Sequence, residues 1–402
     1  MTEQTSGKVP QIRFKSFEEE WNTCRLDEAA TVERGKFSAR PRNDPKYFGG
    51  NIPFVQTGDV VSANRRLRRF SQTLNEEGLA VSRSFPKDTI LITIAANIGD
   101  LAISDFDVAC PDSVVAINVR DEFDTNFLHD FLGTKKDYLE AAATTAAQAN
   151  INLKILKPLI VVLPTLNEQT QIGEYFRALD GLIGLHQRKH DKLVTMKKAM
   201  LQKMFPQPGA TVPGIRFKGF EGNWVAKKLG EVGAFNPKEE LPEVFEYVDL
   251  ESVTGTEMIN HRSEKKKTAP SRAQRLAQRG DLFFQTVRPY QKNNYLFTLP
   301  FTNYVFSTGY AQIRPFNDGS FLLGMMQREE FVKLVLDNCT GTSYPAINAN
   351  VLAEIFIMVP TPEEQQKIGT YFRTLDALIA QHATQLQKLQ QLKSACLEKM
   401  FV

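Results

Sequence analysis

The sequence has few of the side chains from which most catalytic and metal sites are built. Its 402 residues include only five histidines and four cysteines. Cys24, Cys110, Cys339 and Cys396 lie far apart and form no C-x-x-C pair or Cys/His cluster. This spacing favours buried or incidental thiols in a reducing compartment over a structural zinc site or a disulfide framework. A Ser/His/Asp or Cys/His catalytic site is also hard to assemble from so few histidines.

Long apolar runs and cofactor motifs are missing as well. No stretch of about 20 apolar residues occurs, and "MTEQTSGKVP" has no apolar signal core, so we expect a cytoplasmic protein. No H-E-x-x-H, P-loop or G-x-G-x-x-G run is present. The net charge of +3 and the pI of about 8.5 lie below what bulk-charge binding of nucleic acid requires. DNA binding would therefore need local patches or a partner that supplies positive surface.

The chain repeats itself after about 200 residues. "VPQIRFKSFEEEW" at 9–21 returns as "VPGIRFKGFEGNW" at 212–224. "LPTLNEQTQIGEYFRALDGLIGLHQ" at 163–187 returns as "VPTPEEQQKIGTYFRTLDALIAQHA" at 359–383, and "LQKMF" at 201–205 returns as "LEKMF" at 397–401. Solenoid units run roughly 20 to 50 residues, so this period indicates a duplicated domain.

Each repeat pairs a strand-rich head with a long helical segment. β-type runs occur at 52–60, 89–95, 113–119, 246–253, 281–287 and 310–316, and short helices are expected at 125–141 and 319–337. The sequence therefore predicts an α+β fold with two mixed α/β heads, at 1–163 and 207–359. The helical segments that follow them are expected at 164–206 and 360–402.

A heptad stripe runs along both helical segments. Its members are Ile172, Leu179, His186 and Leu193 in the first copy, and Ile368, Leu375, His382 and Leu389 in the second. A second row begins at Tyr175 and continues through Leu182 and Met196. The pattern predicts an antiparallel coiled coil about 54 Å long between the heads, in a near-circular pseudo-two-fold arrangement. His186 and His382 are interpreted as polar interface residues rather than ligands.

Basic and polar-aromatic segments in the heads are the candidates for DNA binding. Arginine and lysine neutralise phosphates, and Arg, Asn and Gln can contact base edges. The alternative for any single charge run is a solvated surface. The first head offers Lys36, Arg40, Arg42, Lys46, Tyr47, Gln56, Thr57, Arg65, Arg66, Arg68 and Arg69. The second head offers Lys265, Lys266, Lys267, Arg272, Arg288, Tyr290, Lys292, Asn293, Asn294, Ser343 and Tyr344.

One stretch points to an alternative function. "NDPKYF" at 43–48 is similar to the loop with which amino-methyltransferases hold a flipped base, although Lys46 replaces a proline. The Gly-rich cofactor loop that should accompany it is absent from the sequence, so a loop in a non-catalytic domain is favoured over a stand-alone adenine methyltransferase. A coiled-coil adaptor whose heads bind proteins is the other alternative.

The whole chain resembles a specificity subunit of a type I restriction–modification system. The resemblance rests on "IRFKxF…W", on "GKFSARPRNDPKYFGGNIPFVQTGD" at 35–59, on "GTSYPAIN" at 341–348 (weaker as "TAAQANIN" at 145–152) and above all on the two helix motifs ending in "KMF". The second copy has "FEYVDLESVTG" in place of the "GGxPFVxTGD" pattern.

The resemblance implies a prokaryotic, non-catalytic subunit without metal or cofactor. Each head would read half of a bipartite DNA target, and the helices would set the spacing and dock two methyltransferase subunits. S-adenosylmethionine, ATP and Mg would bind partners, which include restriction subunits in the full complex. Phe14, Phe17 and Trp21, with Phe217, Phe220 and Trp224, are interpreted as an apolar clasp that seats each head on the helices.

Overall fold

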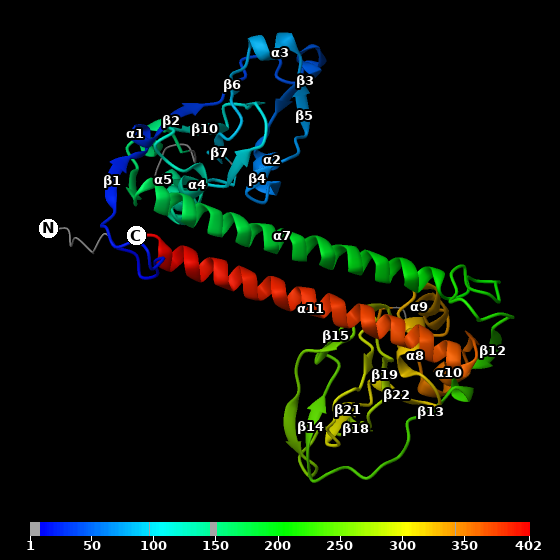
Figure 1. Cartoon of the computed structure of the whole chain (residues 1–402). Coiled ribbons are helices and arrows are strands. Elements are labelled where there is room, and N and C mark those ends of the chain that lie inside the picture. The colour runs from blue at the N-terminus through cyan, green and yellow to red at the C-terminus, as the bar shows by residue number, and fades with distance from the viewer. Residues whose placement is uncertain (1–8, 96, 145–150, 342) are drawn as a thin grey trace. The chain divides into compact units, whose positions relative to one another are not determined.

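The computed structural model describes residues 9–95, 97–144, 151–341 and 343–402 (Figure 1). The chain divides into two compact units, each built from one head and a part of both long helices. Unit 1 comprises Met1–Arg188 with Ala383–Val402, and unit 2 comprises Lys189–His382. Helix α7 (Leu166–Lys203) runs from unit 1 into unit 2, and α11 (Pro362–Met400) runs back.

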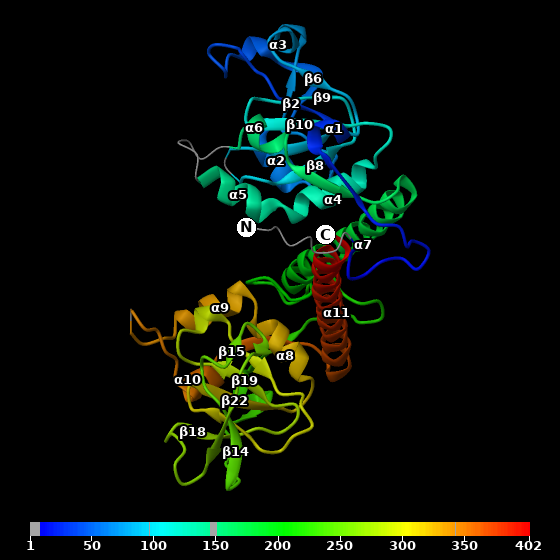
Figure 2. The same cartoon turned by 90° about the vertical axis from the view of Figure 1, so that its left-hand side faces the viewer.

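The head of unit 1 holds two sheets and a two-stranded ribbon. A five-stranded sheet has the order β2-β10-β7-β8-β4, a four-stranded sheet the order β5-β3-β9-β6, and β1 pairs with β11. Helices α4 and α5 lie on one side of the five-stranded sheet (Figures 1 and 2). The elements are β1 (Asn22–Arg25), α1 (Leu26–Ala29), β2 (Ala30–Arg34), a 3-10 turn (Pro45–Tyr47), β3 (Phe48–Phe54), α2 (Thr57–Ser62), β4 (Arg66–Leu67), β5 (Gln72–Leu74), α3 (Glu76–Ala80), β6 (Ser84–Phe85), β7 (Ile90–Thr93), β8 (Leu101–Ser104), β9 (Val108–Ala109), β10 (Val114–Val119), α4 (Thr125–Thr134), α5 (Lys136–Thr144), α6 (Leu153–Leu156) and β11 (Ile160–Leu163).

The head of unit 2 follows the same plan with different details. Its four-stranded sheets have the orders β13-β22-β19-β20 and β17-β14-β21-β18, while β12 pairs with β23 and β15 with β16. Helices α8 and α9 lie at one end of the unit, and β14 and β18 at the other (Figures 1 and 2). The elements are β12 (Val225–Lys228), a 3-10 turn (Leu229–Glu231), β13 (Gly233–Phe235), β14 (Val244–Val248), β15 (Val253–Thr254), β16 (Glu257–Met258), β17 (Arg262–Lys265), β18 (Ala273–Leu276), β19 (Leu282–Gln285), a 3-10 turn (Pro289–Gln291), β20 (Tyr295–Leu296), β21 (Tyr304–Ser307), β22 (Tyr310–Pro315), α8 (Gly319–Met326), α9 (Glu329–Leu336), α10 (Ala349–Ala353) and β23 (Phe356–Val359).

The α+β fold with two repeats and long helices is confirmed, and four of the expected strands match β7, β10, β19 and β22. Three details are wrong. The run at 246–253 is a strand only as far as Val248, and the next strand begins at Val253. The run at 52–60 is a strand only as far as Phe54, because Gln56 and Asp59 form a capping box that starts α2. Each head helix is split in two, since α4 ends before Lys135 and α8 ends before Gln327.

The two long helices run antiparallel within each unit. In unit 1 the Tyr175 hydroxyl lies 3.5 Å from Cys396 Sγ, and Lys393 Nζ lies 2.6 Å from Asp180 Oδ1. In unit 2 Lys197 Nζ lies 2.5 Å from Asp376 Oδ1. Residue numbers therefore rise along α7 where they fall along α11, as the chain order predicts. The near-circular arrangement of the whole chain stays a prediction.

The predicted stripe is buried at the start of each copy and more open further along the helix. Ile172, Leu179, Ile368 and Leu375 are buried, while His186, Leu193, His382 and Leu389 are half-buried. The second row departs from the prediction, because Leu182 is 46% exposed. The helices therefore pack most tightly where a head covers them, at the start of each copy's stripe.

The repeated opening segments attach to the helices by the same contacts. Arg13 donates two hydrogen bonds of 2.7 Å to the buried Glu168 carboxylate at the start of α7. Arg216 binds Glu364 at the start of α11 in the same way, at 2.8 and 2.7 Å. These ion pairs raise the pKa of both arginines, in each case first through the hydrogen bonds to the carboxylate.

The ends of the long helices complete the cores of the heads. Phe401, which follows α11, packs with Trp21, Phe127 and Phe176 in unit 1, with ring centroids 5.2–6.5 Å apart. Phe205, which follows α7, packs in unit 2 with the rings of Trp224, Phe321 and Phe372, 5.4–6.1 Å away. Each "KMF" motif thus fills the core of the head that belongs to the other repeat.

In the apolar clasp predicted from the sequence, two of the three residues in each copy pack in these cores or against a long helix. Trp21 and Trp224 are buried in these cores, and Phe14 and Phe217 pack edge-on against Tyr175 and Tyr371. Phe17 and Phe220 are only half-buried.

Candidate nucleic-acid interface

One group of basic residues lies in the loop between β2 and β3, beside α3. Lys36, Arg40, Arg42 and Lys46 are all exposed there. The Arg42 guanidinium pairs with both oxygens of Asp112 at 2.9 and 3.0 Å, which lowers the pKa of that carboxyl. The loop can therefore present a positive surface, although Arg42 is balanced by Asp112 and Lys46 lies 3.8 Å from Asp44.

The "NDPKYF" stretch has a structural role in this loop. Asp44 caps the 3-10 turn by accepting a hydrogen bond of 3.1 Å from the Lys46 backbone N–H. The ammonium of Lys46 lies over the Tyr47 ring, 4.9 Å from its centroid. The Tyr47 ring itself packs edge-on against Phe37. This packing agrees with the interpretation of the stretch as a loop of a non-catalytic domain.

Gln56 and Thr57 stand at the start of α2 and are half-buried. The Gln56 side-chain amide donates to the Gln72 Oε1 at 3.1 Å, and its backbone N–H donates to Asp59. Both residues lie on the head, but the polar groups of Gln56 are partly occupied by these local contacts.

The run "NRRLRRF" forms the edge strand β4 of the five-stranded sheet and its flanks. The side chain of Arg68 is 74% exposed, although it reaches Asp105 at 3.1 Å. Arg69 is exposed, while Arg66 is half-buried and pairs with Asp88 and Asp105. The strand therefore presents a line of arginines along the sheet edge.

Arg65 must be removed from the predicted DNA contacts. Its side chain is only 2% exposed, and the guanidinium is bound by Asp130 and Asp180. A phosphate cannot reach it without breaking these ion pairs. The charge run in the sequence gave no sign that one of its members points inward.

In unit 2 the first basic group lies on and after the edge strand β17. Lys265, Lys267 and Arg272 are exposed. Lys266 pairs with Glu240 at 3.5 Å and lies 3.9 Å from Glu243. β17 is an edge strand of its sheet, so Lys265 and Lys266 lie at the border of that sheet.

The second group of unit 2 joins two loops that are distant in sequence. The Arg288 backbone N–H donates to the Pro345 carbonyl at 2.8 Å, and the Arg288 guanidinium lies 4.6 Å from the centroid of the Tyr344 ring. Tyr344 is 65% exposed, and Tyr290 and Ser343 are exposed as well. The structure thus brings together residues that the sequence separates by more than 50 positions.

Three other members of this group are engaged in the head itself. Asn294 is buried and its side-chain oxygen accepts from the Gln285 backbone N–H at 2.9 Å, so its predicted DNA contact is wrong. Lys292 pairs with Glu329, and the Asn293 side chain accepts from the Gly255 N–H. These contacts hold the loop in place.

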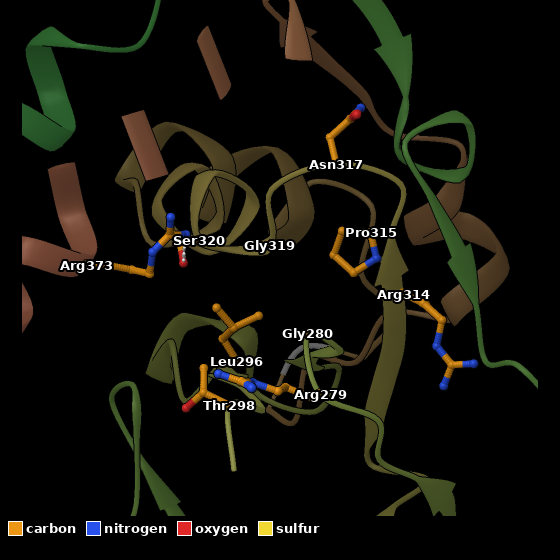
Figure 3. Close-up of a pocket in the computed structure, with 10 residues that line it drawn as sticks. All are labelled: Arg279, Gly280, Leu296, Thr298, Arg314, Pro315, Asn317, Gly319, Ser320 and Arg373. Atoms are coloured by element: carbon orange, nitrogen blue, oxygen red, sulfur yellow. Dashed lines mark hydrogen bonds between the residues drawn. The ribbon is translucent and has the colours of Figure 1, made fainter. Parts of the chain in front are cut away.

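A hollow of about 480 Å³ at the start of α8 contains arginines that the sequence analysis did not select (Figure 3). Arg314 is held by Asp281 and Glu239. The Arg373 guanidinium donates to the Ser320 hydroxyl at 2.9 Å and to the carboxylate of Asp318, which caps α8. These contacts occupy Arg314 and Arg373, while Arg279, which also lines the hollow, is exposed. Arg314 and Arg373 were missed because they stand apart from the charge runs of the sequence.

The described parts of the chain show no group of three or more His, Cys, Asp and Glu side chains placed to hold a metal ion. Within the same residues, no helix has both the length and the apolar composition to cross a membrane.

Two stretches, residues 18–195 and 221–391, match the sequence profile described as "Type I restriction modification DNA specificity domain". The chain belongs to this family. One match falls in each repeat, so the family's domain occurs twice in this member.

Individual relatives of this specificity family align along nearly the whole chain. The MjaIX specificity subunit of Methanocaldococcus jannaschii is 20% identical, over 98% of this chain and 94% of the relative. The MjaVIII specificity subunit of the same organism is 22% identical over 93% and 90%. A crystal structure of an S subunit of a type I restriction–modification system from M. genitalium shares the fold, with a TM-score of 0.66, 17% identity and coverage of 98% and 99%.

Proposed function

We propose that the chain is the DNA specificity subunit of a type I restriction–modification complex and that each unit binds one half of a bipartite duplex target. The observation that carries this proposal is the contrast between the two units. The ion pairs that join the opening segments to the long helices recur in both units, whereas the exposed basic residues differ in sequence and position. A constant frame with two different basic surfaces suits two different half-sites.

Joining two heads makes the recognition of a long target feasible. A wrong base pair costs about 1–3 kcal/mol, so one head that reads a few base pairs discriminates poorly across a genome. Once the first head is bound, a linked second head binds at a high effective concentration, and the two specificities combine. The helix α7, with 38 residues, is about 57 Å long. Because a turn of duplex measures about 34 Å, the half-sites would be separated by base pairs that neither head contacts.

The chemistry belongs to partner subunits in this proposal. Two methyltransferase subunits would bind S-adenosylmethionine and modify adenine, and restriction subunits would use ATP and Mg. Leu182 and Leu185 of α7 and Leu378 of α11 are 38–46% exposed. Exposed apolar side chains on long helices suit a protein partner. The chain itself would supply DNA contacts and no catalytic group.

A methylation map tests the proposal. The chain would be produced with its methyltransferase subunits, and modified adenines would be mapped in host DNA with the wild-type chain and with residues 22–163 replaced by the head of a relative. We expect a bipartite target of which only one half changes in the chimera. Methyl transfer by the pure chain without partners, or DNA retention that does not depend on sequence, would contradict the proposal.

A further inference from the structure

A buried ion cluster in unit 1 joins the head to both long helices. It consists of Arg65, Asp130, Asp180 and Lys393, called here the Arg65 cluster. Arg65 donates to Asp130 at 2.6 and 2.9 Å and to Asp180 at 3.1 Å, and Lys393 reaches the other oxygen of Asp180 at 2.6 Å. These residues come from the β4 flank, α4, α7 and α11, so four segments meet at one point.

The cluster is internally balanced, with two cationic and two anionic side chains. The side chains of Arg65, Asp130 and Asp180 are 2–5% exposed. Burial alone would raise the pKa of Asp130, but the hydrogen bond from His129 and the charge of Arg65 outweigh it and hold that pKa below its ordinary value. Arg65 and Asp130 therefore compensate each other's charge, and Asp180 lies between Arg65 and Lys393.

The backbone at Arg65 is fixed as firmly as its side chain. Its φ of +66° lies in the left-handed region, which residues other than glycine adopt only when their surroundings impose it. Its carbonyl accepts from the Ile103 N–H at 2.8 Å, and β4 begins at the next residue. A Cβ on Gly184 of α7 would lie 3.1 Å from the Asn64 side chain, so this glycine lets the segment approach the helix closely.

Unit 2 keeps only one part of this arrangement. Its pair of Lys197 and Asp376 occupies the positions equivalent to Lys393 and Asp180, 196 residues away in each case, but it is more exposed. The α4 residue Asp130 stands six positions after the Asp124 cap. The residue six positions after the Asp318 cap of α8 is Gly324, which lies against apolar side chains.

A second difference lies in the long helices themselves. Gly184 of α7 has Ala380 as its counterpart in α11, within otherwise similar sequences, "DGLIG" and "DALIA". Arg65, Asp130 and Gly184 thus occur together in unit 1. In unit 2 the positions equivalent to Asp130 and Gly184 hold Gly324 and Ala380. A cluster that served only to pair the helices would be expected in both units.

We propose that Arg65 is a positioning residue for DNA recognition by unit 1: the Arg65 cluster fixes the arginine edge formed by Arg66, Arg68 and Arg69 to α7 and α11, and unit 2 positions its DNA surface without such a device. This inference rests on the proposed function of the heads. Arg65 touches no DNA in it. Its effect passes through β4, which starts directly after it and leads into the exposed Arg68 and Arg69.

The test uses the complex with methyltransferase subunits and two substitutions that separate positioning from folding. Arg65→Lys retains the positive charge but not the paired contacts of the guanidinium. The double variant Arg65→Met with Asp130→Leu removes one charge of each sign and leaves Lys393 to compensate Asp180. Lys197→Met is the matched control, because it removes the helix pair of unit 2.

The readouts are the map of modified adenines and the thermal unfolding of each complex. For both cluster variants we expect the discrimination between bases to fall at least about tenfold in the half-site that the head exchange assigns to unit 1. We expect the other half-site to be unchanged, with unfolding of Arg65→Lys within a few degrees of wild type. Lys197→Met should leave both half-sites as they are.

Other outcomes overturn the inference in distinct ways. An unchanged unit 1 half-site in both cluster variants would show that the cluster does not position the arginine edge. Equal loss at both half-sites, in step with lower thermal stability, would show a purely structural role. If the wild-type complex itself modifies DNA without sequence preference, the proposed function fails, and that result is separate from either of these.

Discussion

Replacing Phe205 by alanine should destabilise unit 2, although this residue belongs to the motif that ends the helix of the first repeat. The side chain is 1% exposed and packs among three aromatic rings of unit 2. Truncation of a buried phenylalanine costs about 3–5 kcal/mol, because apolar contacts are lost and a cavity remains. For a unit of about 200 residues, this corresponds to a fall in Tm of roughly 6–20 °C.

Hydrogen exchange followed by peptide mass spectrometry can locate the effect. We expect faster exchange in α8, β19 and β22, and the strands of unit 1 should keep their protection. Phe316→Ala is the control, because Phe316 is 63% exposed and its truncation should change stability by less than about 1 kcal/mol. Phe401→Ala should have the converse effect, on unit 1. Loss of protection in unit 1 on truncation of Phe205 would refute the exchange of helix ends between the repeats.

Three further predictions concern single contacts. Gly369→Ala should destabilise unit 2 in chemical unfolding, since its Cβ would lie 1.9 Å from a carboxylate oxygen of Asp318, which caps α8. Gly181→Ala is the control: its Cβ would have nothing within 4 Å, so this variant should be neutral or stabilising by up to about 1 kcal/mol. Arg216→Met leaves the buried Glu364 without its partner and should cost about 3 kcal/mol, measured by urea unfolding against a surface lysine variant. The pKa of Asp130 is lowered in the folded state, so its contribution is present above the ordinary value of 3.8 and lost as pH falls through the folded pKa. Unfolding free energies between pH 6 and 3 should fall more steeply in wild type than in Asp130→Asn.

The repeated arrangement of opening segments and long helices could be predicted from the sequence because both copies carry the same motifs. The offsets of 203 and 196 identified the opening segments and the helix motifs, and the structure joins them through matching ion pairs. A heptad stripe indicates which helix face is apolar, but not how much of it a head covers. Leu182 is exposed for this reason, although the head of unit 1 reaches α7 at Asp180 and at Gly184, on either side of it.

The candidate site was harder to predict because a run of charged residues does not show which side chains point to solvent and which are buried. Arg65 and Arg68 stand three positions apart in one run, yet one is buried among carboxylates and the other is open. The partners of Arg65 lie 65 and 115 residues away, beyond any local pattern. Conversely, the pairing of Arg288 with Tyr344 depends on two loops that only the folded backbone brings together.

The exchange of helix ends between the repeats has a consequence for synthesis on the ribosome. Unit 2 contains no residue beyond His382, whereas unit 1 requires Phe401. At 5–20 residues per second, roughly 10–40 s pass between the emergence of residue 188 and that of residue 401. During this interval the core of unit 1 around Trp21 and Phe127 lacks the side chain of Phe401. Unit 2, translated later, can close first, and a nascent chain that stops short would leave unit 1 open to proteases and chaperones.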